Sequence, residues 1–390
     1  MTRICGIIAE YDPLHNGHAW HLAEARKITG ADVIVCMMSM YFTQRGMPAL
    51  LSPHERAKMA LRAGADIVLG LPVSFSLCDG ERFAAGGVSI LRLLGAQALS
   101  FGAEPEGIPW IEPAAALLEK PTEAFQAAFR ALLDRGLSFP KAQGDALAQS
   151  LKADPSLFSL PNTALSICYA RANMRQHAGL ALSPIPRRGD YLATELPEDQ
   201  RALPSATAVR AAALKGDWQS VRRSMPESAY LALKQGFDAG KVHLPEALTP
   251  LLRWALRNEG KILSLPDLSE GIENRFAAAA NCLDRSEMVL TIKSKRYPYA
   301  RISRLLSNLL LGTDRSQLQP LPSHAYLLAA RKEHTALLRQ LQSDDFHLHT
   351  SLNSSCTAYE EQLDARAEAL WSLGAGQPFG AIYREKPFIV

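Results

Sequence analysis

The first hundred residues alternate between short apolar runs and segments with helical periodicity, and this alternation strongly restricts the fold. The apolar runs predict strands over 4–9, 32–38, 67–71 and 98–101. The segments between them predict helices over 18–29, 53–63 and 81–94. Strands separated by helices of this length form a parallel sheet with crossover helices. Ligands bind such sheets at the carboxyl ends of the strands, so we expect the loops after these four strands to surround one site.

The rest of the chain is predominantly helical. Helices are predicted over 113–136, 162–177 and 207–215, and a fifth strand is predicted near 183–186. From about residue 225 the pattern is helical almost throughout. These features predict an α/β fold, with a Rossmann-like domain built on a parallel sheet over 1–224 and a mostly α-helical domain over 225–390.

Composition excludes several classes of protein. Of the 390 residues, 47% are hydrophobic, so a large core can be buried, and 42 basic residues nearly balance 39 acidic ones. Any nucleic-acid surface must therefore be local. The six cysteines are scattered without a CxxC pair, which argues against a zinc site or a disulfide framework and favours reduced thiols. Because no run of 18 apolar residues or signal peptide is evident, we expect a cytoplasmic protein without a membrane span.

A segment with two histidines, His15-Asn16-Gly17-His18, lies at the predicted junction between the first strand and the first helix. Attack on the α-phosphate of ATP adds negative charge to the phosphoryl oxygens, which imidazole N–H groups and the N-terminus of a helix stabilise. Gly17 allows the backbone to approach a nucleotide closely. We therefore expect His15 and His18 to be catalytic in nucleotidyl transfer. His21, one turn further, contacts the nucleotide or packs in the core.

The residues around this segment resemble a known family. The run 7–18, IIAEYDPLHNGH, is similar to the opening of the bacterial tRNA(Met) cytidine acetate ligases, a branch of the HIGH-type nucleotidyltransferase superfamily. Further similar segments follow in the same order at 42–46, 82–88, 101–104, 160–162, 187–188, 205–210, 270–275 and 293–297. Asp12, Met40 and Met47 depart from the family pattern, which usually has Asn, Gly and Glu there.

The resemblance implies a reaction in two steps. Acetate attacks the α-phosphorus of ATP and pyrophosphate leaves, and the exocyclic amine of the wobble cytidine of elongator tRNA(Met) then takes the acetyl group, giving N-acetylcytidine and AMP. The order is chemically sensible, because the cytosine amine is a weak nucleophile and adenylation gives acetate a good leaving group. Mg²⁺ is expected with the ATP phosphates but without a dedicated metal site. No obligatory protein partner is evident.

The resemblance also implies residues for ATP. They are Ile8, Ala9, Glu10, Tyr11, Asp12, Pro13, Leu14, His15, Asn16, Gly17, His18, Ala19, Trp20, His21, Gly102, Asn162, Arg187 and Arg188. Some have an ordinary structural alternative: Gly102 as a turn glycine and Asn162 as a helix N-cap. The start of the helix at Ser205, Thr207 and Arg210 resembles a phosphate-binding helix, although Ser205 is also a normal cap. Candidate bases for the second step are Glu10, Asp12 and Asp79.

A basic stretch in the helical half is a candidate tRNA surface. Between 285 and 304 it contains six basic residues, with Tyr297 and Tyr299 interleaved and only Glu287 opposed to them; the six are Arg285, Lys293, Lys295, Arg296, Arg301 and Arg304. Basic side chains neutralise phosphates and a tyrosine stacks on an unpaired base. With the family resemblance we expect tRNA contacts from Lys293, Lys295, Arg296, Arg301 and Arg304. A solvated helix face is the alternative.

Two other functions share parts of this pattern. A small-molecule adenylyltransferase, which joins AMP to a phosphate-bearing metabolite, has the same HxGH segment but is usually much shorter. A noncatalytic RNA-binding protein on a decayed nucleotidyltransferase fold would not need His15, Gly17 and His18 intact.

Overall fold

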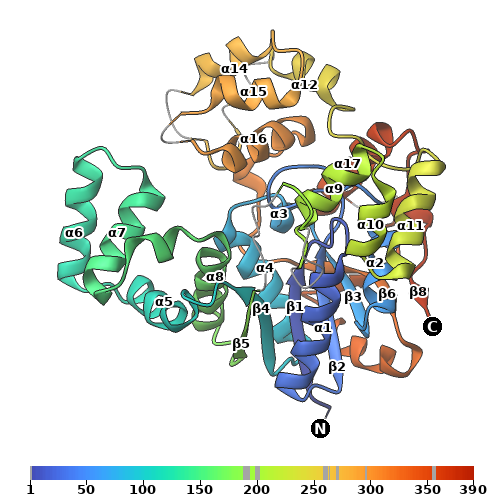
Figure 1. The fold of residues 1–390 in the computed structure, drawn as a ribbon, viewed down its shortest axis with the longest axis horizontal. Helices are drawn as coiled ribbons and strands as arrows, with labels where there is room; N and C mark the ends of the chain where they lie inside the picture. Colours follow the sequence, from blue (N-terminus) through green and yellow to red (C-terminus); the bar gives the residue numbers. More distant parts are fainter. Residues whose placement is uncertain are drawn as a thin grey trace.

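A central β-sheet organises the molecule (Figure 1). The computed structural model describes residues 2–187, 194–197, 203–257, 262, 264–268, 272–294, 297–353 and 357–390. In the described part the sheet has eight strands, with β5-β4-β1-β2-β3-β6-β7 in order and β8 paired to β6.

Five strands of this sheet are parallel and come from the first half of the chain. They are β1 (Ile4–Ala9), β2 (Val33–Ser39), β3 (Ile67–Leu71), β4 (Ala98–Ala103) and β5 (Ala181–Pro186). Their pairing is parallel throughout. The predicted parallel sheet and its five strands are therefore confirmed.

Helices cover both faces of the sheet, and side chains alternate between them. On β2, Ile34, Cys36 and Met38 belong to one core cluster, and Val33 and Val35 belong to the other. All of these side chains are buried because both faces of a parallel sheet carry helices. The crossover helices are α1 (Asn16–Thr29), α2 (Pro53–Arg62) and α4 (Gly80–Leu93).

Further helices follow between β3 and residue 238. The chain forms α3 (Val73–Ser76), α5 (Ile111–Glu119), α6 (Glu123–Asp134), α7 (Phe139–Leu151), α8 (Pro161–Arg175), α9 (Ala206–Leu214), α10 (Trp218–Ser224) and α11 (Glu227–Asp238). The single helix predicted over 113–136 is wrong, because Pro121 disfavours helical backbone at Lys120 and Thr122 then caps a new helix.

The C-terminal half contributes to the same sheet. The helical lobe at the top of Figure 1 comprises α12 (Thr249–Ala255), α14 (Glu273–Ala279), α15 (Arg285–Ile292) and α16 (Tyr299–Leu311), with a core cluster of its own. The chain then returns through β6 (His324–Ala330), β7 (His347–His349) and β8 (Phe388–Ile389), with α17 (Tyr359–Gly374) and α18 (Ala381–Arg384).

The strand β6 corrects the expectation that the chain is helical almost throughout after residue 225. It pairs antiparallel with β3 and all seven of its residues are buried. A short apolar run buried on both faces has no alternation that separates it from a helix. The division into domains at residue 224 stays a prediction. Of the described helices, none combines the length and apolarity that a membrane crossing requires.

Candidate active site

The two histidines of the HxGH segment form a reciprocal cap at the start of α1. His15 is the N-cap residue, and its Nδ1 accepts a hydrogen bond from the Gly17 backbone N–H at 3.0 Å. The His15 backbone N–H donates to His18 Nδ1 at 3.3 Å, and the two rings stack with centroids 3.8 Å apart. Because each Nδ1 accepts, each neutral ring carries its proton on Nε2. The cap thus sets both histidines as Nε2–H donors.

Burial keeps these rings neutral. It lowers the pKa of His15 to about 3, with the cations of Arg187 and Arg210 acting in the same direction. Burial, His15 and Arg187 together lower the pKa of His18 well below its usual value. At neutral pH both side chains therefore act as hydrogen-bond donors rather than as imidazolium cations. They can stabilise phosphoryl oxygens without carrying a charge of their own.

A cleft of about 160 Å³ opens beside these rings at the carboxyl ends of the strands. Its lining includes eleven of the residues expected to bind ATP: Ile8, Ala9, Glu10, Tyr11, Asp12, His15, His18, His21, Gly102, Asn162 and Arg187. Gly17 and Trp20 line a smaller adjoining hollow. Neither lining includes Pro13, Leu14, Asn16 or Ala19. Arg188 lies outside the described residues.

The cleft joins the loops after β1, β2 and β4, as the parallel sheet predicts. Gln44 and Arg45 reach it from the loop after β2. The loop after β3 is not in the lining; it contributes through Cys78, whose carbonyl accepts a hydrogen bond from Gln44 Nε2 at 3.1 Å. His21 both lines the cleft and contacts the core, since its Nε2 lies 3.1 Å from Ser100 Oγ on β4.

Of the three candidate bases, two lie in the cleft. Asp12 is 3% exposed, accepts from the Leu50 backbone N–H at 2.7 Å and pairs with Arg210 at 3.3 Å. Glu10 accepts from the Gln44 backbone N–H at 2.6 Å, and burial raises its pKa. Asp79 instead caps α4 and is absent from the lining. Glu10 is therefore the carboxylate of the three best placed to take a proton.

The region around Asn162 is organised by a carboxylate that the sequence did not single out. Glu104, just after β4, accepts from Asn162 Nδ2 and Thr163 Oγ1, both at 2.8 Å, and from both backbone N–H groups. Burial opposes ionisation, but these hydrogen bonds hold the pKa of Glu104 below its usual value. The N-cap interpretation of Asn162 is wrong, because Leu160 is the N-cap residue and Glu104 supplies the acceptors. The only sequence signal for Glu104 is its place in the segment 101–104, FGAE, which resembles the family.

Gly102 and Ser205 each had an ordinary structural alternative, a turn glycine and a helix cap, which the structure can be compared with. Gly102 lies inside β4 rather than in a turn, and a Cβ there would lie 3.3 Å from Arg187 Cγ. The missing side chain thus lets Arg187 lie close against the strand. Ser205 is the ordinary cap of α9, since its Oγ accepts from the Ala208 N–H at 3.0 Å. Ala206 and Arg210 of the same helix start line the cleft, so this start also faces the site.

Arg285 has a different position from that expected of the basic stretch. It is 3% exposed, and its Nη2 donates to Gly46 O and Ser303 O, each at 2.8 Å. Gly46, at φ +89°, packs so closely that a Cβ would lie 2.4 Å from the Arg304 backbone N. Arg285 therefore fastens the loop that carries Gln44 and Arg45 to α16, which sequence reasoning missed.

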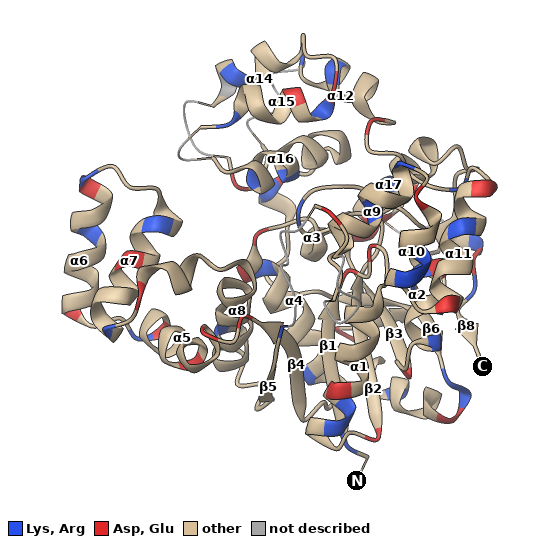
Figure 2. Cartoon of the chain, viewed as in Figure 1, with Lys and Arg blue, Asp and Glu red and all other residues tan. Residues whose placement is uncertain are grey.

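The other residues of the basic stretch differ in exposure. Lys293 is exposed, whereas Lys295 and Arg296 lie outside the described residues. Arg301 donates to Asp267 O at 3.1 Å and lies over the Tyr297 ring. Of the two interleaved tyrosines, Tyr297 is buried, at 6% exposed, whereas Tyr299 is exposed, so Tyr299 is the one whose ring is accessible to a base. Figure 2 shows the Lys and Arg positions along α14, α15 and α16.

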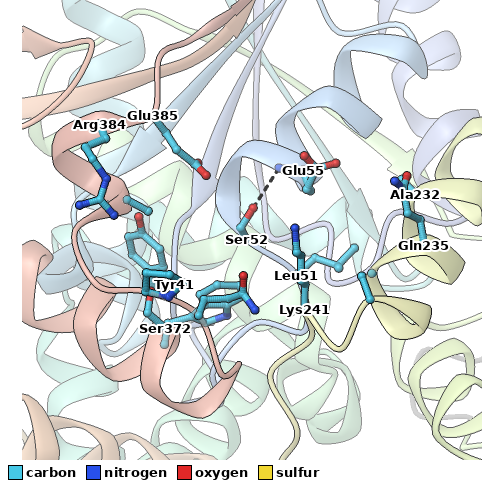
Figure 3. A pocket seen from close by; sticks show the side chains of 16 residues that line it. Tyr41, Leu51, Ser52, Glu55, Ala232, Gln235, Lys241, Ser372, Arg384 and Glu385 are labelled. Carbon is cyan, nitrogen blue, oxygen red and sulfur yellow. Dashed lines mark hydrogen bonds between the residues drawn. The ribbon is translucent and has the colours of Figure 1, made fainter.

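Size alone does not identify the site. The cavity in Figure 3 is larger, about 380 Å³, and is formed by Tyr41, the start of α2, the end of α11 and the α17–α18 region. It contains none of the motif residues. Within the described ranges, no group of three or more His, Cys, Asp or Glu is arranged to hold a metal ion.

A parallel sheet with a histidine pair at the start of its first helix defines a nucleotidyltransferase of the HIGH type. A family model described as HIGH Nucleotidyl Transferase matches residues 2–380, and the chain belongs to that family.

Relatives place the chain more narrowly. The tRNA(Met) cytidine acetate ligase of Acetivibrio thermocellus is 33% identical over 87% of this chain and 86% of its own length. That of Lactiplantibacillus plantarum is 33% identical over 95% of both chains. The chain is thus a member of the tRNA(Met) cytidine acetate ligase family.

Solved structures agree in fold. Apo TmcAL from Thermotoga maritima superposes with a TM-score of 0.90 at 25% identity and covers 100% of both chains. A second form of that protein, bound with alpha-thio ATP, gives a TM-score of 0.89 at 24% identity, also over 100% of both chains.

Proposed function

We propose that this protein is an ATP-dependent acetate ligase that acetylates the exocyclic amine of the wobble cytidine of elongator tRNA(Met). Membership of the family supports the overall reaction. The observation that carries the chemistry is the neutral His15–His18 pair at the start of α1, aligned by its own cap. ATP lies along the expected residues, from Ile8 to His21 and at Gly102, Asn162, Arg187 and Arg188.

In the first step, an acetate oxygen attacks the α-phosphorus and the bond to the pyrophosphate oxygen breaks. Negative charge grows on the phosphoryl oxygens, and the Nε2–H donors of His15 and His18 stabilise it. Arg210 and Arg187 line the same cleft as fixed cations, and a guanidinium can bind a phosphate through two parallel hydrogen bonds. The electron pair leaves with pyrophosphate, which produces acetyl-adenylate.

In the second step, the cytidine amine attacks the acetyl carbonyl carbon and AMP leaves with the bonding pair. The amine must lose a proton as the amide forms. Glu10 takes that proton in our proposal, because it lines the cleft and burial raises its pKa toward the range of a useful base. The acceptor base is reached most easily in a single-stranded loop.

The remaining partners follow from the same reaction. Mg²⁺ is expected with the ATP phosphates, where it would neutralise part of their charge, and Glu10 and Asp12, the carboxylates of the described cleft lining, would help to hold it. Lys293, Arg301 and Arg304 on the helical lobe, with Lys295 and Arg296, contact tRNA phosphates. We place the enzyme in the cytoplasm, with no obligatory protein partner.

The test uses labelled acetate. The protein is incubated with ATP and labelled acetate, with and without elongator tRNA(Met), and acid-precipitable label is counted. Label that requires both ATP and tRNA supports the proposal, and His15→Ala should abolish it while tRNA binding persists. Transfer of AMP to a phosphate-bearing metabolite, without label in RNA, would identify a small-molecule adenylyltransferase instead.

A further inference from the structure

A second charged cavity lies between the start of α4 and the helical lobe. It has a volume of about 190 Å³ and is lined by three arginines from three elements. These are Arg82 on α4, Arg304 on α16 and Arg315 in the short helix η3 (Arg315–Gln317). We call this cavity the arginine hollow. Asp79 and Asp267 also line it, so its three cations face two carboxylates.

The two carboxylates do not accept from all the N–H donors of the arginines in the hollow. Asp79 is occupied as the cap of α4, accepting from the Arg82 backbone N–H at 2.9 Å. Asp267 lies 3.6 Å from Arg304 Nη2, and the buried Arg304 Nε has no hydrogen-bond partner in the described structure. Arg315 interacts electrostatically with the adjacent Asp314, but no ion pair or side-chain hydrogen bond joins it to a described residue. Arg82 is already engaged, since it pairs with Glu360 at 3.2 Å.

A buried hydroxyl in the same lining also lacks a partner. Thr313 is 3% exposed, and its Oγ1 has no hydrogen bond within the described ranges. Burying a hydroxyl or a guanidinium N–H without an acceptor is unfavourable. An anion with several acceptor oxygens would satisfy Thr313, Arg304 and Arg315 together. Phosphate has this chemistry, and guanidinium groups bind it through paired hydrogen bonds.

The hollow adjoins the active-site cleft. Cys78 lines the hollow, and its carbonyl accepts from Gln44 Nε2, while Gln44 itself lines the cleft. Arg82 lines the hollow and the next residue, Phe83, lines the cleft. The hollow and the cleft are therefore neighbours, joined by the Gln44–Cys78 hydrogen bond and by consecutive residues of α4.

We propose that the arginine hollow binds a backbone phosphate of the RNA strand whose cytidine enters the cleft. This inference rests on the proposed function, since it takes the acceptor to be RNA. The structural feature that carries it is the convergence of Arg304, Arg315 and the unpartnered Thr313 beside the cleft. Free phosphate or pyrophosphate has the same chemistry, and the experiment distinguishes it from RNA.

The test changes Arg315, because its exposed side chain can be removed without opening the core. Arg315→Ala and Arg315→Lys are compared with Arg92→Ala, an exposed arginine at the opposite end of α4, about 15 Å along the helix from Arg82. In each protein we would measure KM for tRNA, KM for ATP, and the dependence of tRNA Kd on salt. Inhibition by inorganic phosphate and by pyrophosphate is measured in parallel.

We expect Arg315→Ala to raise KM for tRNA about tenfold relative to KM for ATP, the effect of losing one charge-assisted phosphate contact. The slope of log Kd against log salt should fall by about 0.7, and Arg315→Lys should restore most of that slope. Thr313→Val, nearly equal in volume, should also raise KM for tRNA.

Three results would overturn the proposal. KM for tRNA could be the same in Arg315→Ala and Arg92→Ala. Arg315→Ala could instead change only KM for ATP or the inhibition by free phosphate and pyrophosphate, which would assign the hollow to a free anion. A wild-type protein that exchanges pyrophosphate but labels no RNA would overturn the proposed function as well, and this pattern differs from the other two.

Discussion

The contact between Gly46 and α16 gives the most quantitative prediction. The loop Thr43–Met47 is closed by the Gly46 N–H on Thr43 O at 2.9 Å and by the Thr43 N–H on Met47 O at 2.8 Å. Gly46 has φ +89°, and a Cβ there would lie 2.4 Å from Ser303 C and from Arg304 N. These are backbone atoms of a helix, so they cannot turn away as a side chain would. We therefore predict that Gly46→Ala separates the loop from α16.

The expected loss of unfolding free energy in Gly46→Ala has two parts. A side chain at positive φ costs about 1 to 2 kcal/mol. Overpacking against a rigid neighbour adds about 1 to 3 kcal/mol. Gly136→Ala is the matched control, because Gly136 has φ +81° and open space around its missing Cβ. It should show only the first part, whereas Gly46→Ala should show both.

The assay combines urea unfolding with acetate-dependent pyrophosphate exchange into ATP. Because the same loop holds Glu10 through Gln44 and carries Arg45 into the cleft, a displacement of about 1 Å should slow exchange by about tenfold to hundredfold. Gly136→Ala, in the loop between α6 and α7, should exchange at the wild-type rate. Equal losses of stability in the two variants, with equal exchange rates, would refute the coupling of the loop to α16.

Three further predictions concern burial and the site. Arg56 is fully buried and donates to Glu10 O at 2.6 Å, Ser39 O at 2.9 Å and Leu51 O at 3.1 Å. Arg56→Met leaves these carbonyls without a donor, so it should lower the free energy of unfolding in urea titrations by about 3 kcal/mol or more, and a change below about 1 kcal/mol would contradict this. Asn162→Ala and Thr163→Val each remove one side-chain hydrogen bond to Glu104, but only Asn162 lines the cleft. Asn162→Ala alone should therefore raise KM for ATP, and equal KM values for ATP in the two variants would exclude a contact between Asn162 and ATP. Burial lowers the pKa of His243 to about 4, below its unfolded value of about 6.5, so the unfolded state takes up protons first and stability falls as pH drops from 6.5 to 4. His243→Leu should flatten that slope by up to about 1.4 kcal/mol per pH unit, and an unchanged slope would show that His243 is not buried neutral.

Local periodicity predicted the part of the fold that local physics decides. The five parallel strands and their crossover helices follow from apolar runs, caps and glycines, as at Ser52 before α2 and Gly30 after α1. β6 was missed because its seven buried residues have no alternation, and its place beside β3 depends on a contact between residues more than 250 positions apart. Nothing in a local window indicates such a pairing.

The site shows the same division between local and long-range information. The HxGH segment was sufficient to find the histidine pair, because the cap is made by residues three apart. The role of Arg285 could not be predicted, since a basic residue in a basic stretch gives no sign that its partner is Gly46, 239 positions away. Glu104 was visible as part of a motif, but its four hydrogen bonds to Asn162 and Thr163 depend on where α8 begins.

The central claim is that the His15–His18 pair activates acetate by adenylation before any RNA is involved. Acetate-dependent exchange of labelled pyrophosphate into ATP, measured without tRNA, tests it most directly. The wild-type protein should exchange only when acetate is present, and His18→Ala should reduce the rate by at least about a hundredfold while keeping its affinity for tRNA. Exchange that does not depend on acetate, or that survives in His18→Ala, would contradict the account.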